Sequence, residues 1–138
     1  MATKDLSAIS SRMKKLDICM MTTQSGRGVL TSRPMSNNGD VEYDGNSWFF
    51  TFEGSQKVKD ITNNPQVNLN FEGPKNLFIS VTGSAKLIHN KARLQEHWLD
   101  ELKQWFKEGV DTPGIVLIHV KASRITYWQN EDEGEIKL

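Results

Sequence analysis

The segment GSQKVKDI, at residues 54–61, places a hydroxyl and two lysines where a helix is predicted to begin. Ser55 is a favourable N-cap residue, and the first backbone N–H groups of a helix have no partner within the helix. Lys57 and Lys59 then lie in the first turn, where the positive end of the helix dipole disfavours cations. A phosphate would accept hydrogen bonds from the N–H groups, the hydroxyl and an ammonium together. The alternative is a solvated lysine on a short amphipathic helix whose apolar residues pack inward.

A second candidate for chemistry is the sequence TSRPM, at residues 31–35 of a predicted strand. Arg33 and Met35 share one face of that strand because side chains alternate with a period of two. Pro34 cannot donate a ladder hydrogen bond, so the strand lies at an edge or bulges there. A bulge would expose backbone groups beside the charge of Arg33. An arginine in a surface ion pair at the rim of a barrel explains the same residues.

Aromatic residues are the third feature, with 4 tryptophans and 6 phenylalanines in the chain. Trp98, Trp105 and Phe106 recur at helical spacing, which favours a place in the core over a cofactor site. Trp128 follows Tyr127 near the end of a predicted strand, where an aromatic ring can stay exposed. Trp128 is therefore the aromatic candidate for contact with a ligand.

Other kinds of catalytic site find little support in the sequence. His89, His97 and His119 are scattered, and neither a two-histidine motif nor a cysteine pair predicts a metal site. Cys19 is the only cysteine and lies in an apolar strand, where a buried thiol is usually inert. The sequence has no GxSxG motif, P-loop or GxGxxG motif. We therefore expect no bound metal and no covalent nucleophile.

The composition is that of an ordinary globular protein, and we expect residues 1–138 to form a single domain. Lysine plus arginine and aspartate plus glutamate both number 17, so no net charge favours nucleic acid or an anionic membrane. No apolar run is long enough for a transmembrane helix, and the first residues lack a hydrophobic signal segment. A lone cysteine suits a reducing compartment. These features predict a cytoplasmic protein without nucleic-acid or membrane partners.

Hydrophobic periodicity predicts three helices around these groups. A short amphipathic helix is expected at residues 6–16, and a second begins after Ser55 and ends at residues 63–65, where proline disfavours helical geometry. Asn90 is predicted to cap a third helix that stops at Gly109. One face of this third helix carries Leu94, Trp98, Leu102, Trp105 and Phe106.

Alternating or continuous apolar runs bounded by turn residues predict the strands. They are residues 18–24, 29–36, 47–52, 67–71 and 77–89, followed by one or two strands within 114–129. Turns are predicted at SGRG and NNGD, and Gly83 marks a bulge or bend inside a long strand. Six or so strands joined by hairpin-length turns favour a mainly β protein with flanking helices, an α+β fold built on a small antiparallel barrel.

The order of these motifs resembles the pyridoxamine 5'-phosphate oxidase-like flavoproteins, the FMN-binding split barrels, with the general stress protein 26 type the most similar. The resemblance extends over nearly the whole chain. Its motifs are TSRPM, WFFT followed by GSQKV, VNLNF, FISVTGSAKL, QWFKEGVDTPGIVLIHV and YWQ. It implies a six-or-so-stranded antiparallel split β-barrel that binds FMN, and a homodimer with the flavin at the interface.

In the family pattern, an arginine strand, an aromatic-threonine pair and a Ser-Arg-Lys turn contact the flavin ring and the FMN phosphate. The resemblance implies that Ser55 and Lys57 hold the phosphate and that backbone groups around Arg33 to Met35 meet the ring. The FMN-binding residues that it implies are Ser32, Arg33, Pro34, Met35, Phe50, Thr51, Ser55, Gln56, Lys57 and Trp128.

Three departures from the family pattern limit what the resemblance implies. Gln56 stands in place of a phosphate-binding arginine, and Arg33 is the candidate to compensate. No lysine follows Met35, where the oxidase has one. After Trp128 the oxidase has an arginine and a histidine that grip the vitamin phosphate, whereas this chain continues NEDEGEIKL. We therefore expect bound FMN without oxidation of pyridoxamine 5'-phosphate.

Two functional hypotheses follow from the resemblance. The first is a flavin-dependent oxidoreductase linked to the stress response, with a nicotinamide cofactor or another small molecule as reductant or substrate. Because the flavin carries the chemistry, no acid–base pair need appear in the sequence. The second is a non-catalytic flavin-binding protein that acts as a sensor or an interaction module. The substrate and any catalytic residue stay open.

Overall fold

Seven strands form one sheet within the residues that the computed structural model describes, 1–37 and 42–138. The strands are β1 (Ile18–Gln24), β2 (Leu30–Ser36), β3 (Asn46–Phe52), β4 (Gln66–Gly73), β5 (Leu77–Ile88), β6 (Ile115–Gln129) and β7 (Asp132–Lys137). The α-helices are α1 (Ser10–Met13), α2 (Gln56–Asn63) and α3 (Lys91–Glu96), and the 3-10 helices are η1 (Leu6–Ala8), η2 (Asp100–Gln104) and η3 (Gly109–Asp111). The turn predicted at NNGD reaches residues 38–40, which lie outside the described residues.

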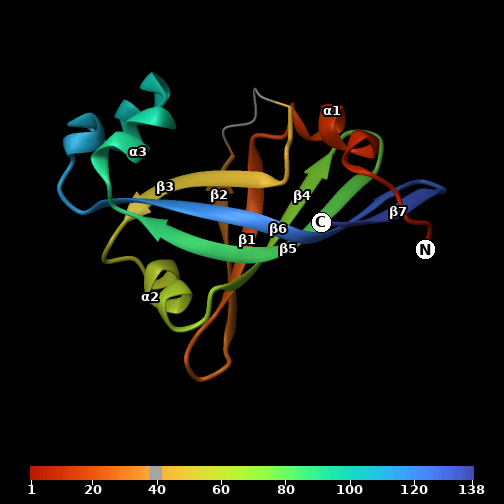
Figure 1. The fold of residues 1–138 in the computed structure, drawn as a ribbon, viewed down its shortest axis with the longest axis horizontal. Helices are drawn as coiled ribbons and strands as arrows, with labels where there is room; N and C mark the ends of the chain where they lie inside the picture. The colour runs from red at the N-terminus through yellow and green to blue at the C-terminus, as the bar shows by residue number, and fades with distance from the viewer. Residues whose placement is uncertain (38–41) are drawn as a thin grey trace.

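The sheet is antiparallel throughout and curls into a half-barrel with helices beside it, which confirms the predicted α+β split-barrel class. Its strand order is β2-β1-β4-β5-β6-β3, and β7 also pairs with β6. Strand β6 is a single strand that pairs with β3 through its first half and with β7 through its second half. As a result, α3 lies at one end of β6 and β7 lies at the other (Figure 1).

The bulge predicted at Gly83 is confirmed by the pairing of β5 with β6. The register between the two strands shifts between Thr82 and Gly83. A Cβ atom added at Gly83 would lie 2.5 Å from the carbonyl oxygen of Lys121. Any side chain here would force the strands apart, so this close approach requires glycine.

Buried apolar residues form two clusters. The larger cluster joins the N-terminal segment, through residues such as Ile9 and Met13, to the inner face of β1, β4, β5 and β6. Cys19 belongs to it, and burial raises the pKa of its thiol to about 12, as expected for an inert cysteine. The smaller cluster lies beneath α3 and η2 and contains Phe50, Leu94, Leu102, Phe106, Ile115 and Leu117.

The prediction of a single helix from Asn90 to Gly109 is wrong. Asn90 does cap a helix, accepting hydrogen bonds from the backbone N–H groups of Ala92 and Arg93. That helix, α3, ends at Glu96, and His97 already departs from helical geometry with φ −108° and ψ 4°. The chain continues through η2 and η3 as short turns that wrap the smaller cluster. Tertiary packing therefore overrides the helical spacing of the apolar residues.

The N-terminal helix and the C-terminal tail also differ from the predictions. The helix expected at residues 6–16 is divided between η1 and α1. The acidic tail, for which no strand was predicted, forms β7 as a hairpin with β6. Asn130 lies in the hairpin turn with φ 55°, a conformation that asparagine tolerates better than most residues. None of the helices within the described residues is long and apolar enough to cross a membrane.

Candidate functional site

A pocket of about 370 Å³ lies where β2, β3, α2 and η2 meet. It is lined by Ile18, Pro34, Met35, Ser36, Phe50, Thr51, Phe52, Lys57, Leu102, Trp105 and Phe106. Half of the ten residues implied by the resemblance are among them: Pro34, Met35, Phe50, Thr51 and Lys57. The pocket is largely apolar, and two of its polar residues, Thr51 and Lys57, meet where β3 approaches α2.

The start of α2 has the features of an unfilled cap. Ser55 has the extended N-cap conformation, φ −73° and ψ 153°, yet among the described residues its side chain makes no capping hydrogen bond. Its Oγ atom is buried and has no hydrogen-bond partner within the described chain. A buried hydroxyl without a partner is costly, and the first N–H groups of a helix also require acceptors. An anion at this helix start would satisfy both requirements.

Lys57 projects from the first turn of α2 toward β3. Its Nζ atom donates a hydrogen bond to Oγ1 of Thr51 at 3.0 Å. Burial, and then the nearby charge of Arg33, lower the pKa of Lys57. Both causes disfavour the ammonium form, so a negative charge beside Lys57 would remove an existing penalty.

Arg33 and Gln56 face a buried carboxylate, that of Asp60 on α2. Gln56 donates from Nε2 to Oδ1 of Asp60 at 2.9 Å. Thr23 donates from Oγ1 to Oδ2 of Asp60 at 2.6 Å, and it accepts a 2.6 Å bond from the guanidinium of Arg33. A second guanidinium nitrogen of Arg33 lies 3.8 Å from Oδ2 of Asp60. Arg33 is thus half-buried in an internal ion pair, unlike the surface ion pair that the sequence left open.

The Asp60 carboxylate is held in its charged form even though it is 2% exposed. The hydrogen bond from Thr23 is the main cause that lowers the pKa of Asp60. Burial raises this pKa, whereas the hydrogen bond from Gln56 and the charge of Arg33 lower it further. Two hydrogen-bond donors and a nearby cation around one carboxylate are the expected solution for a buried charge.

The opposite wall of the pocket is aromatic and comes from the segment after α3. Phe106 is buried and lies 4.8 Å from the Phe52 ring, centroid to centroid. Trp98 packs edge-on against Phe50, at 5.5 Å. Trp105 lines the pocket with 55% of its surface exposed, so its predicted place in the core is wrong. It follows the end of η2 as the chain turns, and its ring faces the pocket and solvent.

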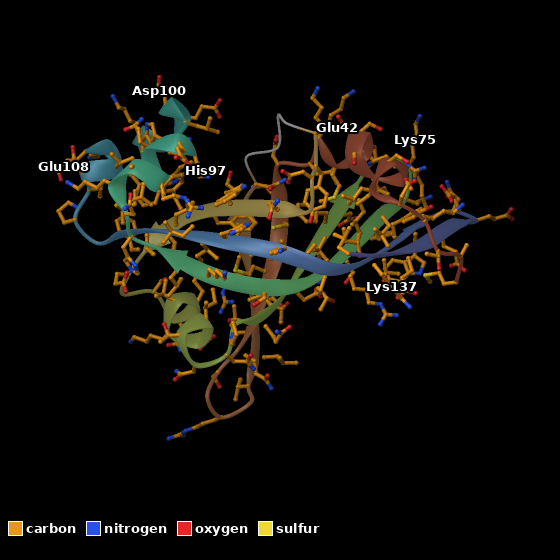
Figure 2. The ribbon with its side chains drawn as sticks, viewed as in Figure 1. Glu42, Lys75, His97, Asp100, Glu108 and Lys137 are labelled. Carbon is orange, nitrogen blue, oxygen red and sulfur yellow. The ribbon has the colours of Figure 1, made fainter. Side chains whose placement is uncertain are left out.

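Behind this wall, Trp48 of β3 lies between two histidines. Its ring centroid is 3.6 Å from that of His97 and 4.0 Å from that of His119, and both pairs are stacked. Figure 2 shows His97 on the side of α3 nearest the sheet. Nε2 of His119 lies 2.7 Å from Oδ1 of Asn46.

The environment of both imidazoles disfavours a positive charge. Burial is the main cause that lowers the pKa of His97 and of His119. The cations Arg93 and Lys86 and the neighbouring His97 lower the pKa of His119 further, while Asp44 opposes them. Arg93 also lowers the pKa of His97, against the opposing effect of Glu96.

Five of the ten implied residues do not line the pocket. Arg33 and Gln56 face Asp60, Ser55 lies at the start of α2, and Ser32 and Trp128 lie elsewhere on the sheet. Ser32 shares a 2.5 Å hydrogen bond with Thr22 on the outer face of the sheet. Trp128 pairs with Phe78 in the half of β6 that also pairs with β7. The pocket residues Phe50, Thr51 and Phe52 pair instead with the first residues of β6. Both Trp128 and Phe78 are exposed.

The sequence reasoning missed Asp60 and the aromatic wall. Asp60 carries a recognisable signal, because an acidic residue stands between Val58 and Ile61 on the buried face of a helix. The wall residues Leu102, Trp105 and Phe106 were noted, but their helical spacing led to a core interpretation. Only the break after Glu96 brings them to the pocket.

This fold defines a split-barrel protein whose apolar pocket includes a lysine from the first turn of α2. The chain belongs to the family described as "Pyridoxamine 5'-phosphate oxidase like", which matches residues 4–138. A curated relative, Protein bli-3 of Neurospora crassa, is 27% identical over 127 residues. That match covers 82% of this chain and 59% of the relative, so the chain spans about three-fifths of the curated relative's length.

Solved structures share the fold at low sequence identity. A protein related to general stress protein 26, from Clostridium acetobutylicum, has a TM-score of 0.83 and 19% identity, covering 96% of this chain and 94% of that one. General stress protein 26 from Bacillus anthracis has a TM-score of 0.79 and 22% identity, covering 96% and 98%. A pyridoxamine 5'-phosphate oxidase-related, FMN binding protein from Nostoc punctiforme has a TM-score of 0.66 and 15% identity, covering 94% and 85%.

Proposed function

We propose that residues 1–138 form one FMN-binding domain, with the flavin in the pocket and its phosphate at the start of α2. The observation that carries this proposal is the buried, unpartnered Oγ of Ser55 beside an uncapped helix start within the described residues. Lys57, in the first turn of the same helix, lines the pocket and supplies an ammonium. Hydroxyl, N–H groups and ammonium together fit a phosphate and no neutral ligand group.

The remainder of the pocket fits the flavin ring. Its volume of about 370 Å³ lies in the range of small-molecule sites, and its lining is mostly aromatic and aliphatic. Phe50 and Met35 form the wall nearest the sheet, and Trp105 forms the wall nearest solvent. Bound FMN would supply hydride and single-electron chemistry, and these residues would bind and orient it.

A titration of the apo-protein with FMN and with riboflavin, followed by flavin fluorescence, tests this proposal. We expect FMN to bind at least tenfold more tightly, because a charge-assisted phosphate contact adds about 1.5–3 kcal/mol. Riboflavin has the same ring and lacks the phosphate, so it is the matched ligand control. Equal affinities would show that the start of α2 is not a phosphate site.

We further propose that the protein is a flavin-dependent oxidoreductase linked to the stress response. Among the described pocket residues the polar side chains are Ser36, Thr51 and Lys57, and they would position the flavin and exclude water. The reductant would be a nicotinamide nucleotide or another small molecule. Anaerobic addition of NADH and NADPH to the FMN-loaded protein should bleach the visible flavin band. Dithionite, which reduces flavins chemically, is the positive control for bleaching. A spectrum that both nucleotides and small thiols leave unchanged would favour the non-catalytic sensor or interaction module.

The tail supports the expectation that pyridoxamine 5'-phosphate is not the substrate. Arg124 could have replaced the missing phosphate-binding residues, but it forms an ion pair with Glu135. Asp132 likewise pairs with Arg12 at 3.0 Å. Arg12 and Arg124 are therefore already paired with carboxylates. We expect no pyridoxal 5'-phosphate formation by the FMN-loaded protein, and turnover with a micromolar KM would overturn this proposal.

The position of Trp128 supports a homodimer in which a second copy supplies this residue to the flavin. The outward face of the sheet carries exposed Ile18 and Met20 on β1 together with Phe78 and Trp128. Such side chains gathered on one sheet face are typical of an interface. Sedimentation analysis of the wild type and of Phe78→Asp tests the assembly. A monomeric wild type with full FMN affinity would contradict the shared site.

A further inference from the structure

We propose that Asp60 is a specificity-determining residue of the phosphate subsite, because it retains the charge of Arg33 inside the protein and leaves Lys57 as the cation that meets the anion. This inference rests on the proposed FMN site. Among the described residues that line the pocket, Lys57 is the only cation. The number of cations free to attract a phosphate would then be set by a carboxylate that does not contact the ligand.

The geometry around Asp60 joins α2 to the first two strands. Thr23 of β1 stands between the carboxylate and the guanidinium, donating to Asp60 at 2.6 Å and accepting from Arg33 at 2.6 Å. Arg33 also donates to the carbonyl oxygen of Met21 at 3.3 Å. The guanidinium is therefore tied to β1 on one side and to Asp60 on the other, at 3.8 Å.

Gln56 stands where the family pattern has a phosphate-binding arginine, but it does not take over that contact. Its side-chain amide donates to Asp60 at 2.9 Å, so it turns toward the carboxylate rather than toward the open helix start. The expectation that Arg33 compensates for the missing arginine is revised by the same contacts. Gln56 and Arg33 both interact with Asp60. Lys57 instead donates a hydrogen bond to Thr51, which lines the pocket.

Among the described charges near the subsite, the exposed Lys59 apart, the ones that are at least partly buried are the cations Arg33 and Lys57 and the anion Asp60. Arg33 is close enough to Lys57 to lower its pKa, which shows that the two positive charges interact. Asp60 offsets one of them, so the resting protein is not strained by an excess of positive charge. Removing that carboxylate charge would leave Arg33 and Lys57 together, and a phosphate would then relieve their repulsion.

The variant Asp60→Asn tests this inference because it keeps the size of the side chain while removing its charge, although one acceptor oxygen becomes an NH2 donor. We expect the ratio of riboflavin Kd to FMN Kd to rise roughly tenfold. The reason is that the charge of Arg33, no longer offset by Asp60, would attract the FMN phosphate over several ångströms. Asp5→Asn is the matched control, because it removes an exposed carboxylate charge at the N-cap of η1. An unchanged ratio in Asp60→Asn would overturn the inference.

A double variant keeps the inference testable if the single variant folds poorly. In the double variant Arg33→Gln with Asp60→Asn, both charges are gone and the net charge near Lys57 equals that of the wild type. We expect its riboflavin-to-FMN ratio to lie within about twofold of the wild-type ratio. A ratio at least tenfold lower would show that Arg33 binds the phosphate directly, and the inference would fail. A wild-type ratio near one would instead refute the proposed FMN site itself.

Discussion

The two walls of the pocket are held in place by different forces. On the α2 side, Thr51 and Lys57 line the pocket. The neighbouring network of Thr23, Arg33 and Asp60, which does not line it, is fixed by short hydrogen bonds around a buried charge. On the η2 side, Phe106 and Trp98 are fixed by ring packing against Phe50. The polar wall offers charge and direction, whereas the aromatic wall offers area. Recognition of an anion should therefore depend on the first wall, and stability on the second.

The strongest test of the aromatic wall is Phe106→Ala. Phe106 is 4% exposed and central to the smaller cluster, so we expect it to lower the free energy of unfolding by about 3 kcal/mol. Phe52→Ala is the matched control, because Phe52 contacts the same ring yet is 44% exposed. Urea denaturation of both variants measures the difference. Equal losses would show that the wall is not stabilised by burial.

The corresponding test of the polar wall is Lys57→Ala. We expect FMN affinity to fall by a factor of about 10–100, which corresponds to about 1.5–3 kcal/mol for a charge-assisted bond. Riboflavin affinity should not change. The apo-protein should be as stable as the wild type or slightly more stable, because a cation at a helix N-terminus opposes the dipole. Lys59→Ala, in the same turn and exposed, is the control for general charge.

The histidines beside Trp48 should make the aromatic wall sensitive to pH. The pKa values of His97 and His119 are lowered in the folded protein, so the unfolded chain binds more protons in the range between the two sets of values. Stability is then unaffected above about pH 6.5 and decreases as the pH falls below it through the folded-state values.

Thermal melts at pH 8 and pH 5 measure this effect. The double variant His97→Gln with His119→Gln should lose less stability over that interval than the wild type. The carboxylate of Asp60 does not interfere, because its pKa is lowered and its contribution is lost only below about pH 4. An equal loss in both proteins would place the sensitivity elsewhere.

The smallest effect is expected from Trp105→Ala. Because more than half of the Trp105 surface is exposed, its removal should change the free energy of unfolding by less than about 0.5 kcal/mol. Its contact is with the ring side of the pocket, so FMN and riboflavin should both bind about threefold more weakly. A selective loss of FMN affinity would place Trp105 at the phosphate instead.

Local patterns were sufficient for most of the fold. The strand periodicity, the Asn90 cap, and the glycine at the β5 bulge were all predicted from neighbouring residues. The break after Glu96 was not, because it depends on a cluster formed with β3 and β6, which are distant in sequence. The tail strand was missed because its alternating acidic residues have low strand propensity and gain their pairing from β6.

The polar half of the candidate site could be proposed from sequence, whereas its charge balance could not. Ser55 is a favoured N-cap residue, whereas Lys57 in the first turn opposes the helix dipole. Such a conflict between local preference and fold often marks a functional site. The pairing of Arg33 with Asp60 depends on the angle between α2 and the β1–β2 hairpin, which no local pattern specifies.

The burial of Cys19 has a practical consequence for measuring how this protein moves. The thiol is 1% exposed, and its raised pKa keeps it protonated at neutral pH. An alkylating reagent can therefore react with it only when β1 separates from the core. Since the sequence contains one cysteine, the labelling rate under native conditions reports the frequency of a single opening event. The alkylation rate of Cys19 thus measures how often β1 opens from the central sheet without any added label site.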